Sequence, residues 1–173
     1  MREKTREIAF IGILVAMSVV LARFASVRIT IGGIEGVRIG FGTFPIILAG
    51  LLFGPLLGAL TGALADVIGF ALSPMGPYFP HFTLSAALYG VLSGVFGHFP
   101  FRARGPRLFL AVAAPQVGIG CFLTPYFLHT LFGMPWKVLL VPRLVSTPFN
   151  VLFSTLLLLS LSRVPLFAAL GER

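Results

Sequence analysis

A carboxylate and a row of glycines lie together inside one of the most apolar stretches of this sequence. They recur every four residues, as Gly54, Gly58, Gly62 and Asp66. Each step of four turns a helix by only ~40°, so the four residues form one track along a helix face. Glycine tracks let helices pack closely, whereas a carboxylate within a membrane usually faces a cavity or a partner. We therefore predict a packing role for the glycines and a binding role for Asp66, with structural pairing as the alternative.

A second set of polar residues follows helical spacing near the end of the chain. Steps of three and four residues place them on one face of an otherwise apolar segment, as Arg143, Ser146, Thr147, Asn150 and Ser154. We predict that this face points into the protein. The guanidinium of Arg143 can bind a carboxylate through two hydrogen bonds, and its alternative is snorkelling to the membrane surface. The alternative for the whole face is hydrogen bonding between helices, which averages only ~0.6 kcal/mol per bond.

An aromatic segment between two apolar stretches suggests a binding loop. Three prolines stiffen residues 73–83, which carry Tyr78, Phe79, His81, Phe82 and Thr83. Flat heteroaromatic rings stack on such side chains for ~1–3 kcal/mol each in nucleic-acid complexes. The alternative is an aromatic belt at the membrane interface. Because the prolines hold the rings in place, we predict that the segment binds a flat ligand.

The elements that would hold these residues are membrane-spanning helices. Of 173 residues, 57% are hydrophobic and 10% are charged, and the mean hydropathy is +1.01, which a soluble domain does not show. A spanning helix needs ~20 apolar residues, and six apolar stretches occur, at 8–24, 40–53, 55–72, 82–97, 108–131 and 143–162. We predict an all-α membrane protein, a single six-helix domain over residues 1–173, with a long outer loop between its first two helices. The second stretch reaches only ~21 Å, so we expect it to end inside the protein.

The net charge of +8 indicates a membrane protein rather than a nucleic-acid binder. The basic residues fall in short connections, and such residues collect on the cytoplasmic side of membrane proteins. With both termini cytoplasmic, eight basic residues lie inside and five outside, so we expect this orientation. The outer residues are Arg23, Arg28, Arg38, Lys137 and Arg143. Several of them sit at helix ends, where they could hold a ligand, and among them we select Arg38 and Arg143 as candidates for binding an anionic group. The single cysteine, Cys121, excludes a disulfide framework or a cysteine-based metal site within this chain.

Two more features complete the candidate set. Gln116 shares a helix face with Gly120 and Thr124, and its side chain offers both a donor and an acceptor to a ligand edge. On the first helix, Gly12 and Ala16 form a small-xxx-small pair, which leaves a smooth strip for another helix. We predict that this strip docks a partner, and packing within the bundle is an equal alternative.

Three catalytic signatures are absent from the sequence. They are the phosphate-binding loop G-x-x-x-x-G-K-[ST], the metalloprotease motif H-E-x-x-H and the nucleophile motif G-x-S-x-G. We therefore expect no enzyme activity and no cofactor. An intramembrane enzyme would have to use Asp66, His81 and His129 as acid and base, and these are far apart in sequence. A channel would need a more continuous row of polar residues.

Several motifs together resemble one transporter family. They are Arg38-Ile39-Gly40-Phe41-Gly42, Leu52-Phe53-Gly54-Pro55, the glycine track to Asp66, Tyr78-Phe79-Pro80-x-Phe82-Thr83-Leu84-Ser85-Ala86 and the stretch from Pro142-Arg143 to Pro148-x-Asn150. The combination resembles the S components of energy-coupling factor (ECF) vitamin transporters, and it is most similar to the folate-specific branch. The resemblance covers almost the whole chain. It includes Gly12-x-x-x-Ala16, where the family has an Ala-x-x-x-Ala docking motif, but His81 stands where a small residue is expected.

The resemblance implies a subunit of a prokaryotic cell membrane that captures folate or a related pterin from outside. Its partners would be a transmembrane coupling subunit and two ATPases, which would supply the missing phosphate-binding loops. The docking strip on the first helix would meet the coupling subunit while the S component topples in the membrane. An S component for another vitamin or heteroaromatic precursor is the alternative within the family.

The same resemblance suggests which part of the ligand each candidate residue would bind. The rings of Tyr78, Phe79 and Phe82 would stack on or enclose the pterin. The groups that bind the pterin edge would be Asp66, Gln116 or Asn150. The acidic tail would meet Arg143 or Arg38, and His81 would add a hydrogen bond in the aromatic loop or indicate a different flat, anionic ligand.

Overall fold

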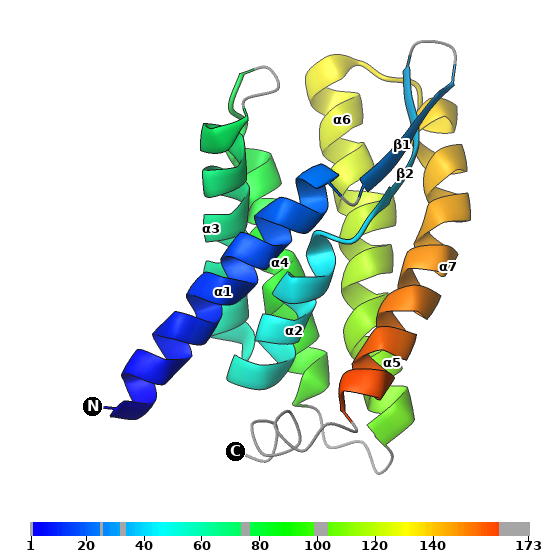
Figure 1. Ribbon diagram of the computed structural model, residues 1–173. Coiled ribbons are helices and arrows are strands. Elements are labelled where there is room, and N and C mark those ends of the chain that lie inside the picture. The colour runs from blue at the N-terminus through cyan, green and yellow to red at the C-terminus, as the bar shows by residue number, and fades with distance from the viewer. Residues whose placement is uncertain (1, 25, 32–33, 74–76, 99–103, 163–173) are drawn as a thin grey trace.

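The computed structural model describes residues 2–24, 26–31, 34–73, 77–98 and 104–162, which form a bundle of helices with one small β-hairpin (Figure 1). In chain order the elements are α1 (Arg2–Phe24), β1 (Ser26–Ile31), β2 (Ile34–Gly40), α2 (Thr43–Phe53), α3 (Pro55–Leu72), α4 (Pro80–Gly97), α5 (Arg104–Pro115), η1 (Gln116–Leu123), α6 (Thr124–Phe132) and α7 (Trp136–Leu161). Because α5, η1 and α6 follow one another without a break, the described residues form six helical segments, as the sequence predicts.

Four of these segments are long and apolar enough to cross a membrane. They are Thr5–Phe24, Pro55–Leu72, Gly105–Phe132 and Trp136–Leu161. In Figure 1, α1 begins and α7 ends at the same end of the bundle. The hairpin, the end of α3 and the connection between α6 and α7 lie at the opposite end, which we call the hairpin end.

The predicted helix boundaries are accurate for α3 and wrong for α7. α3 runs over Pro55–Leu72, as predicted. α7 starts at Trp136 instead of residue 143 because the helix continues through Pro142 and Pro148. Proline is tolerated inside membrane helices, where neighbouring helices can satisfy the freed backbone groups. Pro142 therefore does not mark a helix start.

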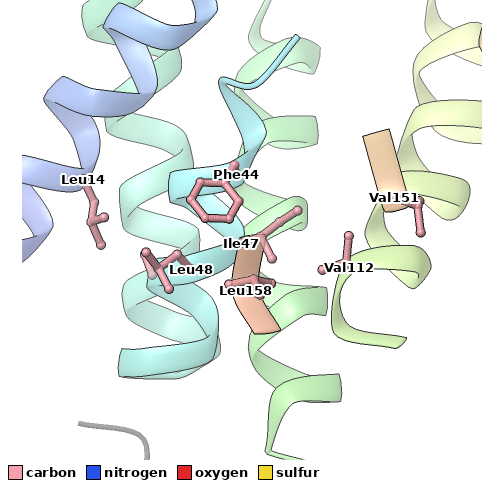
Figure 2. Close-up of a cluster of buried hydrophobic side chains, with 8 residues drawn as sticks. Leu14, Phe44, Ile47, Leu48, Val112, Val151 and Leu158 are labelled. Carbon is pink, nitrogen blue, oxygen red and sulfur yellow. The ribbon is translucent and has the colours of Figure 1, made fainter. Parts of the chain in front are cut away.

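The short helix α2 lies at the centre of the bundle. Its 11 residues reach only ~17 Å, and every residue from Phe44 to Gly50 is buried. Figure 2 shows Phe44, Ile47 and Leu48 among side chains from neighbouring helices. The surrounding side chains are Leu14 of α1, Val112 of α5, and Val151 and Leu158 of α7. The 11-residue length is consistent with the prediction that the second apolar stretch is too short to cross the membrane unaided, and Phe44–Gly50 of this helix lie inside the protein.

Glycines bring α2, α3 and α4 into backbone contact. A Cβ atom on Gly62 would lie 2.1 Å from the Ala86 carbonyl oxygen, and one on Gly58 would lie 2.7 Å from the Gly90 carbonyl oxygen. The packing role predicted for Gly58 and Gly62 is therefore confirmed. Gly54 does not extend this track, because it lies between α2 and α3 with φ = 88° and a Cβ atom on it would meet nothing within 4 Å. Its role is to turn the chain, since other residues rarely adopt this backbone angle.

A β-hairpin occupies the connection that the sequence analysis describes as a long outer loop. β1 and β2 pair antiparallel, from Ser26 opposite Gly40 to Ile31 opposite Ile34. β2 contacts α7, and just beyond β2 the ring centroid of Phe41 lies 4.6 Å from that of Phe153. The connection is therefore an ordered element packed against the last helix.

Arg23 joins the end of α1 to the end of α3. Its guanidinium donates hydrogen bonds to the carbonyl oxygens of Gly69 and Ser73. These carbonyls lie at the C-terminus of α3, where backbone acceptors lack helical partners and a positive charge is favoured. Arg23, which the sequence places among the outer basic residues, is therefore a helix-capping residue.

Candidate functional site

Asp66, Thr83 and Tyr78 form a chain of hydrogen bonds toward the hairpin end of α3 and α4. Thr83 Oγ1 donates to Asp66 Oδ2 at 2.6 Å, and the Tyr78 hydroxyl oxygen lies 2.6 Å from Thr83 Oγ1. Because Thr83 has one hydroxyl hydrogen and gives it to Asp66, Tyr78 must donate to Thr83. One oxygen of Asp66 is thus paired within the protein, which was the alternative to direct ligand binding.

Local sequence explains why these side chains meet. Pro80 begins α4, a position where its missing N–H costs nothing, and this places Thr83 in the first turn of the helix. Phe79 before it is extended, so the chain reverses toward α3 and brings Tyr78 back over Phe70. The ring centroids of Phe70 and Tyr78 lie 5.2 Å apart. Tyr78 is therefore held both by its hydroxyl group and by its ring.

The rings at the start of α4 meet rings of α6 in an aromatic cluster. Its members are Phe79, His81, Phe82, Phe127 and Phe132. Ring centroids lie 6.3 Å apart for Phe79 and Phe82, 5.2 Å for Phe79 and Phe132, and 4.9 Å for His81 and Phe127. These three pairs have the edge-to-face geometry that aromatic rings favour. Phe127 and Phe132 are not among the residues predicted from the sequence, although both stand on the helix that follows η1.

Two buried amide groups lack hydrogen-bond partners. Gln116 is only 6% exposed, and within the described part of the chain its Nε2 has no partner, nor does Oδ1 of Asn150. Leaving such a group unpaired costs ~1–3 kcal/mol. Gln116 opens η1, and η1 contacts α7, which carries Asn150. Neighbouring elements thus present one unsatisfied donor and one unsatisfied acceptor.

Two other buried atoms lack partners among the described residues, and neither belongs to a residue of the predicted site. Arg107 Nε belongs to the start of α5, nine residues before Gln116, and Thr155 Oγ1 lies five residues beyond Asn150 on α7. Five residues turn a helix by ~500°, or 140° past a full turn, so Thr155 and Asn150 point in different directions. Only Gln116 and Asn150 belong to the predicted site.

Arg143 is tied to the helix that carries Gln116. Its Nη1 donates to the carbonyl oxygen of Gly120 in η1. A Cβ atom on Gly120 would lie 2.9 Å from the Tyr89 hydroxyl oxygen of α4, so three elements meet at this glycine. Next to it, Cys121 Sγ lies 3.3 Å from Thr147 Oγ1. Tyr89 is not predicted from the sequence, because nothing in its spacing relates it to the polar face of α7.

α4 lies between the two halves of the candidate site. It contacts α3, which carries Asp66, and it also contacts η1 and α6. The candidate site is therefore the region around α4 that includes the Asp66 chain, the aromatic cluster and the amides of Gln116 and Asn150. Arg38 has its backbone in β2, while its side chain lies outside the described part of the structure.

Gly12 and Ala16, the predicted docking residues, lie on α1, which carries none of these side chains. Both are exposed on α1, and a Cβ atom on Gly12 would meet no atom within 4 Å. Ile13, one residue beyond Gly12, is 61% exposed. The strip is therefore an outward surface of the bundle.

The acid and base candidates of an intramembrane enzyme have separate partners. Asp66 accepts from Thr83, His81 packs on Phe127, and His129 Nδ1 lies 2.8 Å from the Met134 carbonyl oxygen. Within the described ranges, His, Cys, Asp and Glu side chains form no group of three that could hold a metal ion. The arrangement offers hydrogen bonds and ring contacts to a ligand.

Three comparisons with known proteins identify the family and the fold of this chain. A family model described as "ECF-type riboflavin transporter, S component" matches residues 2–164. The folate transporter FolT of Clostridium novyi (strain NT) is 36% identical over 144 residues, which represent 83% of this chain and 80% of that protein. A solved structure described as "Crystal structure of FolT bound with folic acid" is similar with a TM-score of 0.78 and 33% identity, and the match covers 94% of this chain and 97% of that chain.

Proposed function

Because this chain belongs to the S components of ECF-type riboflavin transporters, we propose that it is the substrate-binding subunit of a folate transporter. It is a multi-pass membrane protein. The folate transporter of Clostridium novyi (strain NT) and the FolT structure with folic acid support folate, rather than riboflavin, as the ligand. Folate joins a flat pterin ring to a tail with carboxylates, and each part has a counterpart among the candidate residues.

The observation that carries this proposal is the pair of unsatisfied amides. Gln116 Nε2 is a buried donor and Asn150 Oδ1 a buried acceptor. The pterin edge has the complementary groups, a carbonyl oxygen that accepts and an amino group and ring N–H that donate. Ligand binding would satisfy both amides and recover the free energy that their burial costs.

The rest of the ligand has candidate partners at the hairpin end. The aromatic cluster and Tyr78 would enclose the pterin ring, with the Tyr78 ring oriented through Thr83 and Asp66. Arg143 or Arg38 would bind the carboxylates of the tail, since guanidinium groups suit carboxylates. His81, which is exposed beside Phe127, would add a hydrogen bond.

The finer arrangement in the cell follows from the resemblance to ECF transporters. A transmembrane coupling subunit and two ATPases would energise uptake across the prokaryotic cell membrane. Both chain termini would be cytoplasmic, so the hairpin end would face outward and receive the vitamin. The strip of Gly12 and Ala16 would dock the coupling subunit, and its exposure on α1 supports this role.

Direct binding measurements test the choice between folate and riboflavin. In calorimetric titrations of the purified protein in detergent, we expect folate to bind at least about 100-fold more tightly than riboflavin, a difference of about 2.7 kcal/mol. The riboflavin ring presents a carbonyl where pterin presents its amino group, and a site built around an acceptor rejects such a change. Tight binding of riboflavin with no binding of folate would overturn the substrate and leave the family assignment intact.

Replacing Thr83 by valine tests the hydrogen-bond chain. Thr83→Val removes the hydroxyl group that connects Tyr78 to Asp66 while retaining nearly the same shape. A lost hydrogen bond of this kind is worth ~1–3 kcal/mol, so we expect folate affinity to fall by about tenfold as Tyr78 loses its orientation. The matched control is Thr130→Val, because the Thr130 hydroxyl is exposed and bonds only to Tyr126 and Phe127 carbonyls of its own helix. If Thr83→Val and Thr130→Val bound folate with equal affinity, the orientation of Tyr78 would have no role in folate binding.

A further inference from the structure

The helix that carries Gln116 changes its hydrogen-bond register at Pro125. Residues Gln116–Leu123 form a π-helix, in which each N–H reaches the carbonyl five residues earlier. At its end the Thr124 N–H donates to the Ile119 carbonyl. The carbonyl of Gly120 would next receive the N–H of residue 125, but this residue is a proline and has none.

Gly120 therefore loses both of its ordinary backbone donors. Its α-helical donor would be the Thr124 N–H, which is bonded to Ile119, and its π-helical donor would be Pro125. Gly120 is buried, so a carbonyl without a donor would be costly there. The Nη1 group of Arg143 supplies the missing hydrogen bond from α7. A charged donor makes this bond stronger than a neutral one.

The register of η1 decides how Gln116 is oriented relative to α6. Successive residues of an α-helix are ~100° apart, and the wider turns of a π-helix change this angle for every later residue. Gln116 opens the π-helical segment and Phe127 follows it. The angle between the Gln116 and Phe127 side chains around the helix axis therefore depends on the π-helical register. This is the register that leaves the Gly120 carbonyl without a backbone donor.

We propose that Arg143 is a positioning residue: by donating to the Gly120 carbonyl it holds η1 in π-helical register and thereby aims the Gln116 amide at the ligand. This inference rests on the proposed function, because it takes Gln116 to bind the pterin edge. Of the two candidates for the acidic tail, it leaves Arg38, because positioning differs from a direct contact between Arg143 and the tail. A positioning residue affects every ligand that has the ring, whereas a tail contact affects only ligands that have the tail.

Two ligands separate these roles. Folate has ring and tail, and 6-hydroxymethylpterin has the same ring without the acidic tail. For Arg143→Met we expect both affinities to fall by the same factor, about tenfold or more. In a Gln116→Met background the same change should cost less than about threefold further, since Arg143 acts through Gln116. Lys137→Met, which removes an exposed cation from the same helix, should leave both affinities unchanged.

Selective loss of folate affinity in Arg143→Met would overturn the proposal, as would a full additional loss in the Gln116→Met background. If Arg143→Met does not fold, Arg143→Gln replaces it, because glutamine keeps a neutral donor and removes the charge. Equal and small losses for the two ligands would then support positioning, and a loss confined to folate would overturn it. Failure of the unchanged protein to bind either ligand would instead contradict the proposed function.

Discussion

Replacing Gln116 by methionine and Asn150 by leucine together should strongly weaken folate binding and leave the protein folded. Each substitution removes one amide from the pair that would bind the pterin edge and replaces it with an apolar side chain of similar size. Losing both would leave two polar groups of the ligand unpaired, at ~1–3 kcal/mol each. We expect a combined loss in affinity of at least about 100-fold. Calorimetric titration with folate measures this loss.

The stability of the same double variant should change in the opposite direction. Gln116 Nε2 and Asn150 Oδ1 have no hydrogen-bond partners among the described residues, so the unliganded protein gains when apolar groups replace them. Thermal unfolding in detergent without ligand should therefore occur at the same temperature or higher. Residues selected for stability would not behave in this way.

Thr155→Val is the matched control for this experiment. Thr155 Oγ1 is also a buried atom of α7 without a partner in the described structure, but it lies outside the candidate site. The control should raise stability and leave folate affinity unchanged. Normal folate binding by the double variant would contradict a binding role for the two amides, and a loss of stability together with binding would show that they are structural groups. Either result would remove the main observation behind the proposed function.

The helices could be predicted from the sequence because the membrane imposes a simple pattern. An apolar run of the right length indicates a spanning helix, and the run at 55–72 gave both ends of α3. The prediction that α2 is too short to span the membrane also followed from the length of its apolar run. The start of α7 could not be predicted in this way, because whether a proline ends a helix or is accommodated depends on the neighbours that satisfy the backbone.

The hairpin had a sequence signal that a search for helices passes over. Residues 26–31, Ser-Val-Arg-Ile-Thr-Ile, alternate between polar and apolar, and Gly32-Gly33 separates them from a second β-prone run. Alternation around a Gly-Gly pair is typical of a β-hairpin. A prediction based only on hydropathy describes these residues as a loop because they are too polar to span a membrane.

The candidate site was predictable as a set of residues and not as a set of contacts. Spacing placed Arg143 and Asn150 on one face of a helix, and chemistry marked Asp66 and Gln116 as unusual in their surroundings. The contact between Arg143 and Gly120 could not be inferred, because it depends on a π-helical register that no periodicity in the sequence indicates. The same applies to Tyr89, whose position next to Gly120 results from packing between helices.

Gly90→Ala should cause the largest loss of stability among single methyl additions to this protein. A Cβ atom on Gly90 would lie 2.0 Å from the Gly58 carbonyl oxygen and 2.1 Å from its carbon. Both are backbone atoms of α3, so no side chain can rotate away and the two helices must separate. Overpacking typically costs ~1–3 kcal/mol and occasionally more, and we expect at least about 3 kcal/mol here. For a chain of this size that corresponds to a decrease in Tm on the order of 10 °C.

Gly118→Ala is the control, because a Cβ atom there meets nothing within 4 Å and alanine favours helices over glycine. Its melting temperature in detergent should equal that of the unchanged protein or exceed it. If Gly90→Ala had the same melting temperature as the control, this result would show that α3 and α4 can move apart without loss of stability.

The same substitution should also weaken ligand binding, although Gly90 lies outside the candidate site. Gly58, Gly62 and Asp66 follow one another along α3 and face α4, where Gly90 and Ala86 meet the two glycines and Thr83 meets Asp66. The close approach of the glycines thus sets the separation at which Thr83 and Asp66 form a hydrogen bond of 2.6 Å. Moving the helices apart by even one ångström would break this bond and release Tyr78. A folded Gly90→Ala protein should therefore bind folate as weakly as Thr83→Val does, and normal binding would show that the glycine contacts do not position the site.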